Sequence, residues 1–105
     1  MASTGFKFRG LRMARRVDAN QKEIVSTFRS LGASVQILSD IGKGCPDIVV
    51  GAHGKNYLFE IKDGNKPLSA KKLTDCEQIF FSHWRGHVDV IESVEEVIIF
   101  MSKLK

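Results

Sequence analysis

The spacing of apolar residues along the chain alternates between two periods, which predicts a domain of mixed helices and strands. Apolar residues three or four positions apart indicate helices, whereas alternating or short continuous apolar runs indicate strands. These rules place helices at residues 18–32, 74–84 and from 93 onward, and strands at residues 34–38, 45–51, 57–62 and 88–91. The predicted order is therefore α-β-β-β-α-β-α, with a loop at residues 63–72.

The predicted helices have recognisable starts and one apolar side. Two of them begin with capping-box spacing, in Thr74 with Glu77 and in Ser93 with Glu96. An apolar stripe on one side of a helix is expected to face the core. The stripe comprises Ile24, Val25, Phe28 and Leu31 in the first helix, and Val94, Val97, Ile98 and Met101 in the last.

The two central strands are separated by a short segment that predicts a tight hairpin. If His53 and Gly54 are its two turn residues, then Asp47 lies directly opposite Glu60. Opposed residues share a face of the sheet, with Cβ atoms about 4.5–5.5 Å apart. Lys62 follows Glu60 by two positions and points to the same side. The pattern thus gathers two carboxylates and one ammonium group on one face.

Two adjacent carboxylates repel each other, and a divalent cation removes that repulsion. Hard oxygen ligands completed by water suit Mg²⁺, which can activate a water and stabilise charge on a phosphate. Lys62 could orient or deprotonate the attacking water and neutralise the transition state. The alternative interpretation is a surface aspartate together with a solvated Glu–Lys pair.

The charge of the chain favours an anionic partner. The formal net charge is +4, and residues 1–17 form a basic arm without an acidic residue. A basic arm and basic loops beside a cutting site would contact phosphates in a salt-sensitive manner. The candidates for DNA contact are Arg12, Arg15, Arg16, Lys43, Lys66, Lys71 and Lys72. Solvated surface charge is the alternative interpretation for each of them.

Pro46-Asp47 followed by Glu60-Ile61-Lys62 resembles the signature of PD-(D/E)xK nucleases. The resemblance is closer to the virus-type replication-repair nuclease branch, the VRR-NUC domain, and covers about residues 18–100. It rests on Asp18-Ala19-Asn20-Gln21, Gly44-Cys45-Pro46-Asp47, Glu60-Ile61-Lys62-Asp63-Gly64, Leu73-Thr74 and Trp84-Arg85-Gly86. It implies an α/β fold of the restriction-endonuclease-like type, in which helices flank a mixed central sheet.

The resemblance also implies an activity. It indicates a DNA endonuclease that requires Mg²⁺ or Mn²⁺, in which Asp47, Glu60 and the main-chain carbonyl of Ile61 hold the metal. Lys62 would be the catalytic lysine. Stand-alone domains of this type are expected to be homodimers that cut branched DNA, including four-way junctions. A nucleic-acid-binding module that keeps the fold without cutting is the second hypothesis.

Related nucleases place a glutamate on the first helix, facing the metal, and this chain offers two candidates. Glu23 is the acidic residue inside the helix, and the resemblance nominates it as a metal ligand. At 100° per residue, however, Glu23 falls outside the apolar stripe, whereas Gln21 falls within it. Periodicity therefore favours Gln21 as the polar group that faces the sheet.

The remaining features suggest one domain and its compartment. Residues 18–105 suit a single domain that follows the arm of residues 1–17. No secretory signal and no apolar run long enough for a membrane span is evident, so we expect an intracellular protein, in the cytoplasm of a microbial or virus-infected cell, without a membrane partner.

Overall fold

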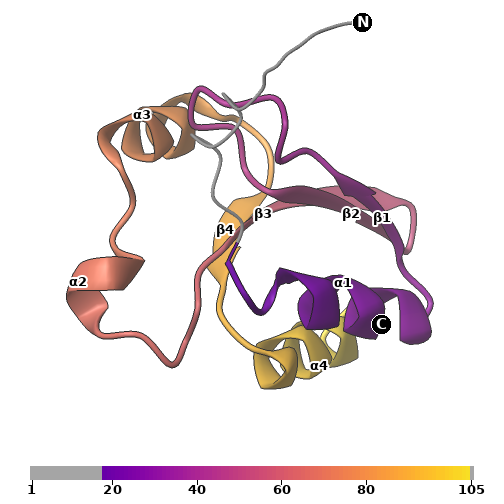
Figure 1. Cartoon of the computed structure of the whole chain (residues 1–105). Helices are drawn as coiled ribbons and strands as arrows, with labels where there is room; N and C mark the ends of the chain where they lie inside the picture. Colours follow the sequence, from indigo (N-terminus) through magenta and orange to yellow (C-terminus); the bar gives the residue numbers. More distant parts are fainter. Residues whose placement is uncertain (1–17, 105) are drawn as a thin grey trace, which may run out of the picture.

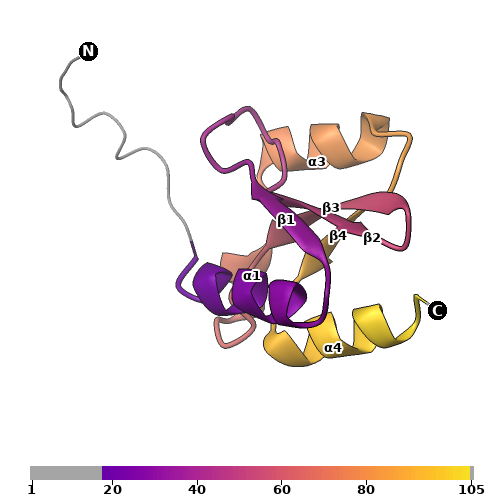
Figure 2. The ribbon, with the colours of Figure 1, turned by 90° about the vertical axis from the view of Figure 1, so that its right-hand side faces the viewer.

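The computed structural model describes residues 18–104, in which a four-stranded sheet separates two layers of helices. Figures 1 and 2 show helices α1 and α4 on one face of the sheet and α3 on the other. The elements are α1 Gln21–Ser30, β1 Ser34–Ile37, β2 Ile48–Ala52, β3 Lys55–Ile61, α2 Leu68–Lys71, α3 Asp75–His83, β4 Val88–Ile91 and α4 Val94–Ser102. The predicted order is confirmed, with one addition: the short helix α2 lies where a loop was expected.

The sheet has the order β1-β2-β3-β4. Its first three strands are antiparallel, whereas β4 pairs parallel with β3. A parallel partner requires a crossover connection. Residues 62–87, which contain α2 and α3, provide that crossover, so the chain leaves β3 and returns across the opposite face from α1. The sheet is mixed, as expected.

The hydrophobic core lies between the sheet and helices α1 and α4. Its largest fully buried side chains include Phe28, Ile24, Ile48 and Ile61. Phe100 of α4 stacks edge-to-face on Phe59, with ring centroids 5.0 Å apart. The opposite face of β3 is therefore free to carry polar groups.

Three apolar residues of the predicted helices and strands lie at the surface: Leu31 and Ile98 from the helical stripes, and Ile37 from the strand predicted at residues 34–38. Leu31, Ile37 and Ile98 are 45%, 46% and 49% exposed. Leu31 is the C-cap of α1 and lies beyond its last turn, and Ile37 ends an edge strand. In α4 the core-facing residues are Val97, Phe100 and Met101, followed by Leu104 after the helix end. Ile98 lies outside this set and faces solvent.

The β2–β3 hairpin has the predicted turn. His53 and Gly54 have φ values of 53° and 79°, as a two-residue turn of type I′ requires. The register from Ala52 and Lys55 to Ile48 and Phe59 follows from that turn. Residues 45–47 were expected in the strand, but β2 begins only at Ile48.

Within residues 18–104, no helix has both the length and the apolar character needed to span a membrane.

Candidate active site

Asp47 and Glu60 lie at neighbouring strand ends, although not as a regular strand pair. The main-chain N–H of Asp47 donates to the Phe59 carbonyl at 3.0 Å, one position off the register of the hairpin. The Asp47 carboxylate turns back and accepts a hydrogen bond from the Ile61 N–H at 2.7 Å. A side chain thus replaces a main-chain partner, and this contact fixes the aspartate beside the end of β3.

Glu60 is a buried carboxylate on the face of β3 opposite the core. Only 5% of the residue is exposed, and its neighbours Phe59 and Ile61 point into the core. Burial first, and then the charge of Asp47, raises the pKa of Glu60 to about 9. Burial likewise raises the pKa of Asp47. At neutral pH the metal-free pair therefore retains a proton that a cation at this position would displace.

Lys62 supplies the positive charge of the site. Its side chain is 11% exposed, and its Nζ lies 3.6 Å from Glu60 Oε2 and 2.9 Å from Glu77 Oε1. Burial alone would lower the pKa of Lys62, but the hydrogen bond and charge of Glu77, with the charge of Glu60, raise it. Lys62 is therefore an ammonium group at neutral pH and serves as a donor and a cation. That charge state favours the orienting role over the role of a base.

Glu77 belongs to the site and was assigned only a capping role from the sequence. The predicted capping box is confirmed: the Thr74 N–H donates to Glu77 Oε1 at 2.9 Å, and the Glu77 N–H donates to Thr74 Oγ1 at 3.2 Å. The same Oε1 atom accepts from Lys62. Because the capping box was a sufficient reason for a glutamate at this position, nothing in the sequence indicated its hydrogen bond with Lys62.

Asp18 and Asn20 also approach the site from the start of α1. The charge of Asp18 contributes to the raised pKa values of Asp47 and Lys62. Asn20 Nδ2 donates to the carbonyls of Lys62 and Glu92, at 3.1 and 3.0 Å. Both residues belong to the sequence motif that resembles the VRR-NUC domain, in which neither side chain was assigned a role. Asn20 instead holds α1 against the ends of β3 and β4.

The two candidates on the first helix have different surroundings. Gln21 is 7% exposed, and Ser39 Oγ donates to its Oε1 at 3.5 Å. Its inward orientation agrees with the helical periodicity, whereas a catalytic role stays a prediction. Glu23 is exposed and lines a polar hollow with Asp63, Glu92, Glu95 and Glu96. Glu23 thus lies among other acidic residues at the start of α4, and its role as a metal ligand stays a prediction.

The lysines expected to contact DNA divide into two groups. Lys43 and Lys72 are exposed, and Lys66 is half exposed with its Nζ 3.7 Å from Asp18. Lys71 is different: its side chain is 15% exposed and its Nζ lies 3.1 Å from Glu92 Oε1. Lys71 therefore attaches α2 to the end of β4, and its contact with DNA stays a prediction. Arg12, Arg15 and Arg16 lie outside the described residues.

The donor set fits a hard divalent cation. Among residues 18–104, no three side chains of the His, Cys, Asp or Glu type form a metal-ligating group. A cation beside Asp47 and Glu60 would therefore take two carboxylates, a main-chain carbonyl and several waters. Mg²⁺ prefers such oxygen coordination and usually keeps several of its waters.

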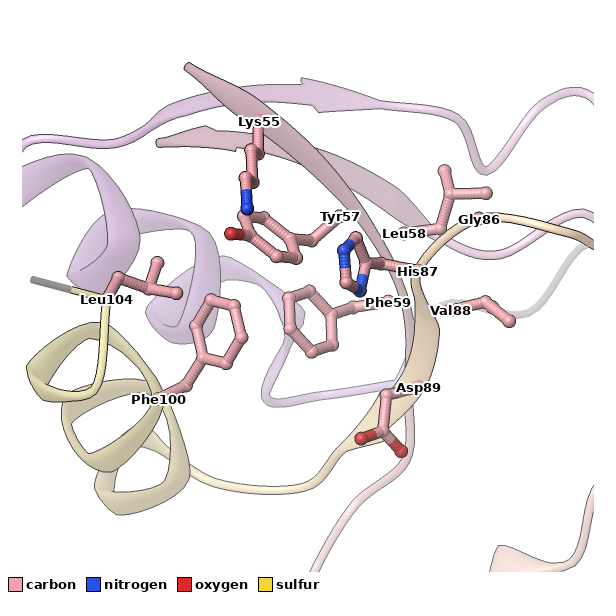
Figure 3. Close-up of a pocket in the computed structure, with 10 residues that line it drawn as sticks. All are labelled: Lys55, Tyr57, Leu58, Phe59, Gly86, His87, Val88, Asp89, Phe100 and Leu104. Atoms are coloured by element: carbon pink, nitrogen blue, oxygen red, sulfur yellow. The ribbon is translucent and has the colours of Figure 1, made fainter. Parts of the chain in front are cut away.

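A second hollow lies on the opposite side of the sheet (Figure 3). It has a volume of about 430 Å³ and is bordered by β3, β4 and α4. Tyr57, Phe59 and Phe100 give it an aromatic wall, and the Tyr57 ring lies 4.9 Å from the His87 ring. Its lining offers one carboxylate, Asp89, and one lysine, Lys55, whereas the other face brings together Asp47, Glu60 and Lys62.

The comparisons with known proteins support the same fold. No protein-family model matches the sequence, and no curated protein matches it. A solved structure described as a VRR_NUC domain superposes with a TM-score of 0.62 at 25% identity, and the match covers 81% of this chain and 92% of that one. The chain therefore has the VRR-NUC fold, with the restriction-endonuclease-like arrangement of a mixed sheet flanked by helices, and forms a nuclease-like domain.

Proposed function

We propose that the protein is a metal-dependent DNA endonuclease that hydrolyses phosphodiester bonds and prefers branched DNA. The observation that carries the proposal is the group formed by the buried Glu60 and Lys62 and the partly buried Asp47 at adjoining strand ends. The two carboxyl groups lie close enough to share a cation, and the protonated Lys62 can stabilise negative charge on a phosphate. The similarity to a VRR-NUC domain supports the same conclusion.

Each residue of the group has a distinct task. Asp47, Glu60 and the carbonyl of Ile61 would hold Mg²⁺ or Mn²⁺, and the ion lowers the pKa of water and stabilises charge on the phosphate. The Ile61 N–H keeps the Asp47 carboxylate in place. Lys62 remains protonated, so its ammonium orients the water and stabilises the negative charge of the transition state.

The proposal includes branched DNA as the substrate and a homodimer as the active assembly. The exposed Lys43 and Lys72 and the half-exposed Lys66 lie in segments that flank the site, where they would contact phosphates irrespective of base sequence. A four-way junction has a pseudo-two-fold shape, which suits two symmetry-related sites of a homodimer.

Cleavage of labelled four-way junction, splayed-arm and plain duplex DNA tests the proposal. We expect products in Mg²⁺ or Mn²⁺, none with chelator, and most product from the junction. Lys62→Ala should lower kcat by about 100- to 1000-fold, as expected when a group that stabilises transition-state charge is lost. Lys55→Ala, which removes an exposed lysine of the hairpin, is the matched control. Tight DNA binding without products in either metal would favour the non-cutting module.

Metal binding should release a proton, because the metal-free Glu60 is protonated at neutral pH. Below the pKa of about 9, the affinity for Mn²⁺ should rise with pH, by at most about tenfold per pH unit for one proton. Calorimetry at pH 7 in two buffers of different ionisation enthalpy measures the number of protons. Glu60→Gln should remove the released proton. Equal heats in both buffers for the unmodified protein would contradict the proposed ligand pair.

A further inference from the structure

One oxygen of Glu77 joins two parts of the fold that are separate in sequence. Glu77 Oε1 accepts a hydrogen bond from the Thr74 N–H at the start of α3 and another from Lys62 Nζ at the end of β3, both at 2.9 Å. The side chain of Glu77 is 15% exposed. The capping box therefore fixes the carboxylate, and the carboxylate in turn fixes the ammonium group.

Lys62 needs such a restraint more than most catalytic groups. A lysine side chain is flexible, and its free rotation is restricted only by what its ammonium contacts. The ammonium has three N–H donors. Within the described part of the chain, Glu77 accepts from it at 2.9 Å and Glu60 Oε2 lies at 3.6 Å. A third donor can then face a water or a phosphate oxygen.

Glu77 also attaches α3 to the sheet. None of the nine residues of α3 is buried, so apolar packing contributes little to its placement. The helix start contacts Gly44 of the loop that leads to Asp47, through the Cys76 main chain. The start of α3 is thus held by that loop and by the ion pair with Lys62.

We propose that Glu77 is a positioning residue that holds the Lys62 ammonium in its reactive place and couples it to the start of α3. The inference rests on the proposed nuclease function. Glu77 acts through Lys62 and does not itself contact the substrate. The acceptor oxygen positions the ammonium, because the capping bond aims that oxygen at Lys62.

Three variants test the role. Glu77→Ala removes both hydrogen bonds, whereas Glu77→Gln keeps an acceptor oxygen of similar reach. Glu96→Ala is the matched control, because Glu96 Oε1 accepts the Glu92 N–H at the start of α4 and forms no ion pair with a lysine within residues 18–104. It therefore reports the loss of a helix-start contact away from the site. The readouts are kcat, KM for junction DNA, and the melting temperature.

We expect Glu77→Ala to lower kcat by roughly 10- to 100-fold, the range for a misplaced catalytic group, with KM for DNA little changed. Glu77→Gln should recover most of that kcat, and Glu96→Ala should keep kcat while losing a similar amount of thermal stability. If Glu77→Ala cuts as fast as the unmodified protein, or if Glu96→Ala loses as much kcat, the positioning role is wrong.

Other outcomes distinguish the positioning role from a metal-ligand role and from a failure of the proposed nuclease function. A large rise in the metal concentration for half-maximal rate, shared by Glu77→Ala and Glu77→Gln, would overturn it in favour of a metal-ligand role. An unmodified protein that cuts no DNA in any metal would defeat the proposed function itself. An unmodified protein that cuts, with a Glu77→Ala variant that cuts equally, would defeat the positioning role alone.

Discussion

Replacing Glu60 by glutamine is expected to abolish cleavage and to stabilise the metal-free protein. Glutamine resembles the protonated carboxyl group that Glu60 forms beside Asp47, but it cannot supply a carboxylate to a metal. At pH 8 the unfolded chain ionises Glu60, whereas the folded protein keeps it protonated, and glutamine removes the free-energy cost of that protonation. At pH 8 we expect a gain of about 1–2 kcal/mol, or about 5–10 °C in Tm, after a discount for relaxation of the native site.

The pH dependence of stability has a definite sign. The folded-state pKa of Glu60, about 9, lies above its ordinary value of 4.5, so the folded protein binds more protons between these two pH values. Stability is therefore fully present below pH 4.5 and declines as the pH rises toward 9. The raised pKa of Asp47 acts in the same direction. The lowered pKa of Glu77 acts in the acid range, below its ordinary value of 4.5.

Thermal unfolding with chelator, from pH 5.5 to 8.5, measures the stabilisation by Glu60→Gln and the decline of stability with rising pH. The advantage of Glu60→Gln over the unmodified protein should grow with pH and shrink when Mg²⁺ is added, since only the unmodified protein gains from the metal. Glu95→Gln removes an exposed carboxylate from the first turn of α4 and is the control for net charge. A Glu60→Gln variant less stable than the unmodified protein at every pH would refute the buried-pair explanation.

Gly44→Ala should be the most damaging of the conservative glycine substitutions. Gly44 has φ of +80°, and an added Cβ would meet the carbonyl oxygen of Cys76 at the start of α3. Left-handed backbone costs an alanine about 1–2 kcal/mol, and the overlap with main-chain atoms adds about 1–3 kcal/mol. The α3 start would have to move, and Glu77, the next residue after Cys76, would move with it.

Gly54→Ala is the matched control for Gly44→Ala. Gly54 has nearly the same φ, +79°, but nothing lies within 4 Å of an added Cβ. Urea unfolding should therefore show a loss of only about 1–2 kcal/mol for Gly54→Ala and a larger loss for Gly44→Ala. Equal losses would mean that α3 adjusts freely, which would also weaken the case for its fixed contact with Lys62.

The sequence predicted the hairpin well because the turn is a local feature. His53 and Gly54 determine the register from their own backbone preferences, and the shared face of Glu60 and Lys62 follows from alternation. The start of β2 was not predictable in the same way. At Asp47 the register shifts by one position and its side chain accepts the Ile61 N–H, a contact between residues 14 positions apart that strand alternation does not predict.

Other differences arise from contacts between distant segments. Lys71 resembles a solvated loop lysine in the sequence, but it lies beside Glu92, which is 21 residues away. Asn20 reaches carbonyls 42 and 72 residues away. Such pairings depend on how the crossover and α1 dock on the sheet. Helical periodicity did, in contrast, separate Gln21 from Glu23 correctly by burial.

The two-residue turn between β2 and β3 also bears on the order of folding events. A hairpin closes a short loop and forms in about 1–10 μs, whereas a parallel pair must wait for its long crossover. We therefore expect Asp47 and Glu60 to become neighbours before β4 joins β3 and before Asn20 bridges the ends of β3 and β4. The two acidic groups meet while the surrounding chain is still open to water, so their mutual repulsion opposes only the later, desolvating steps of folding.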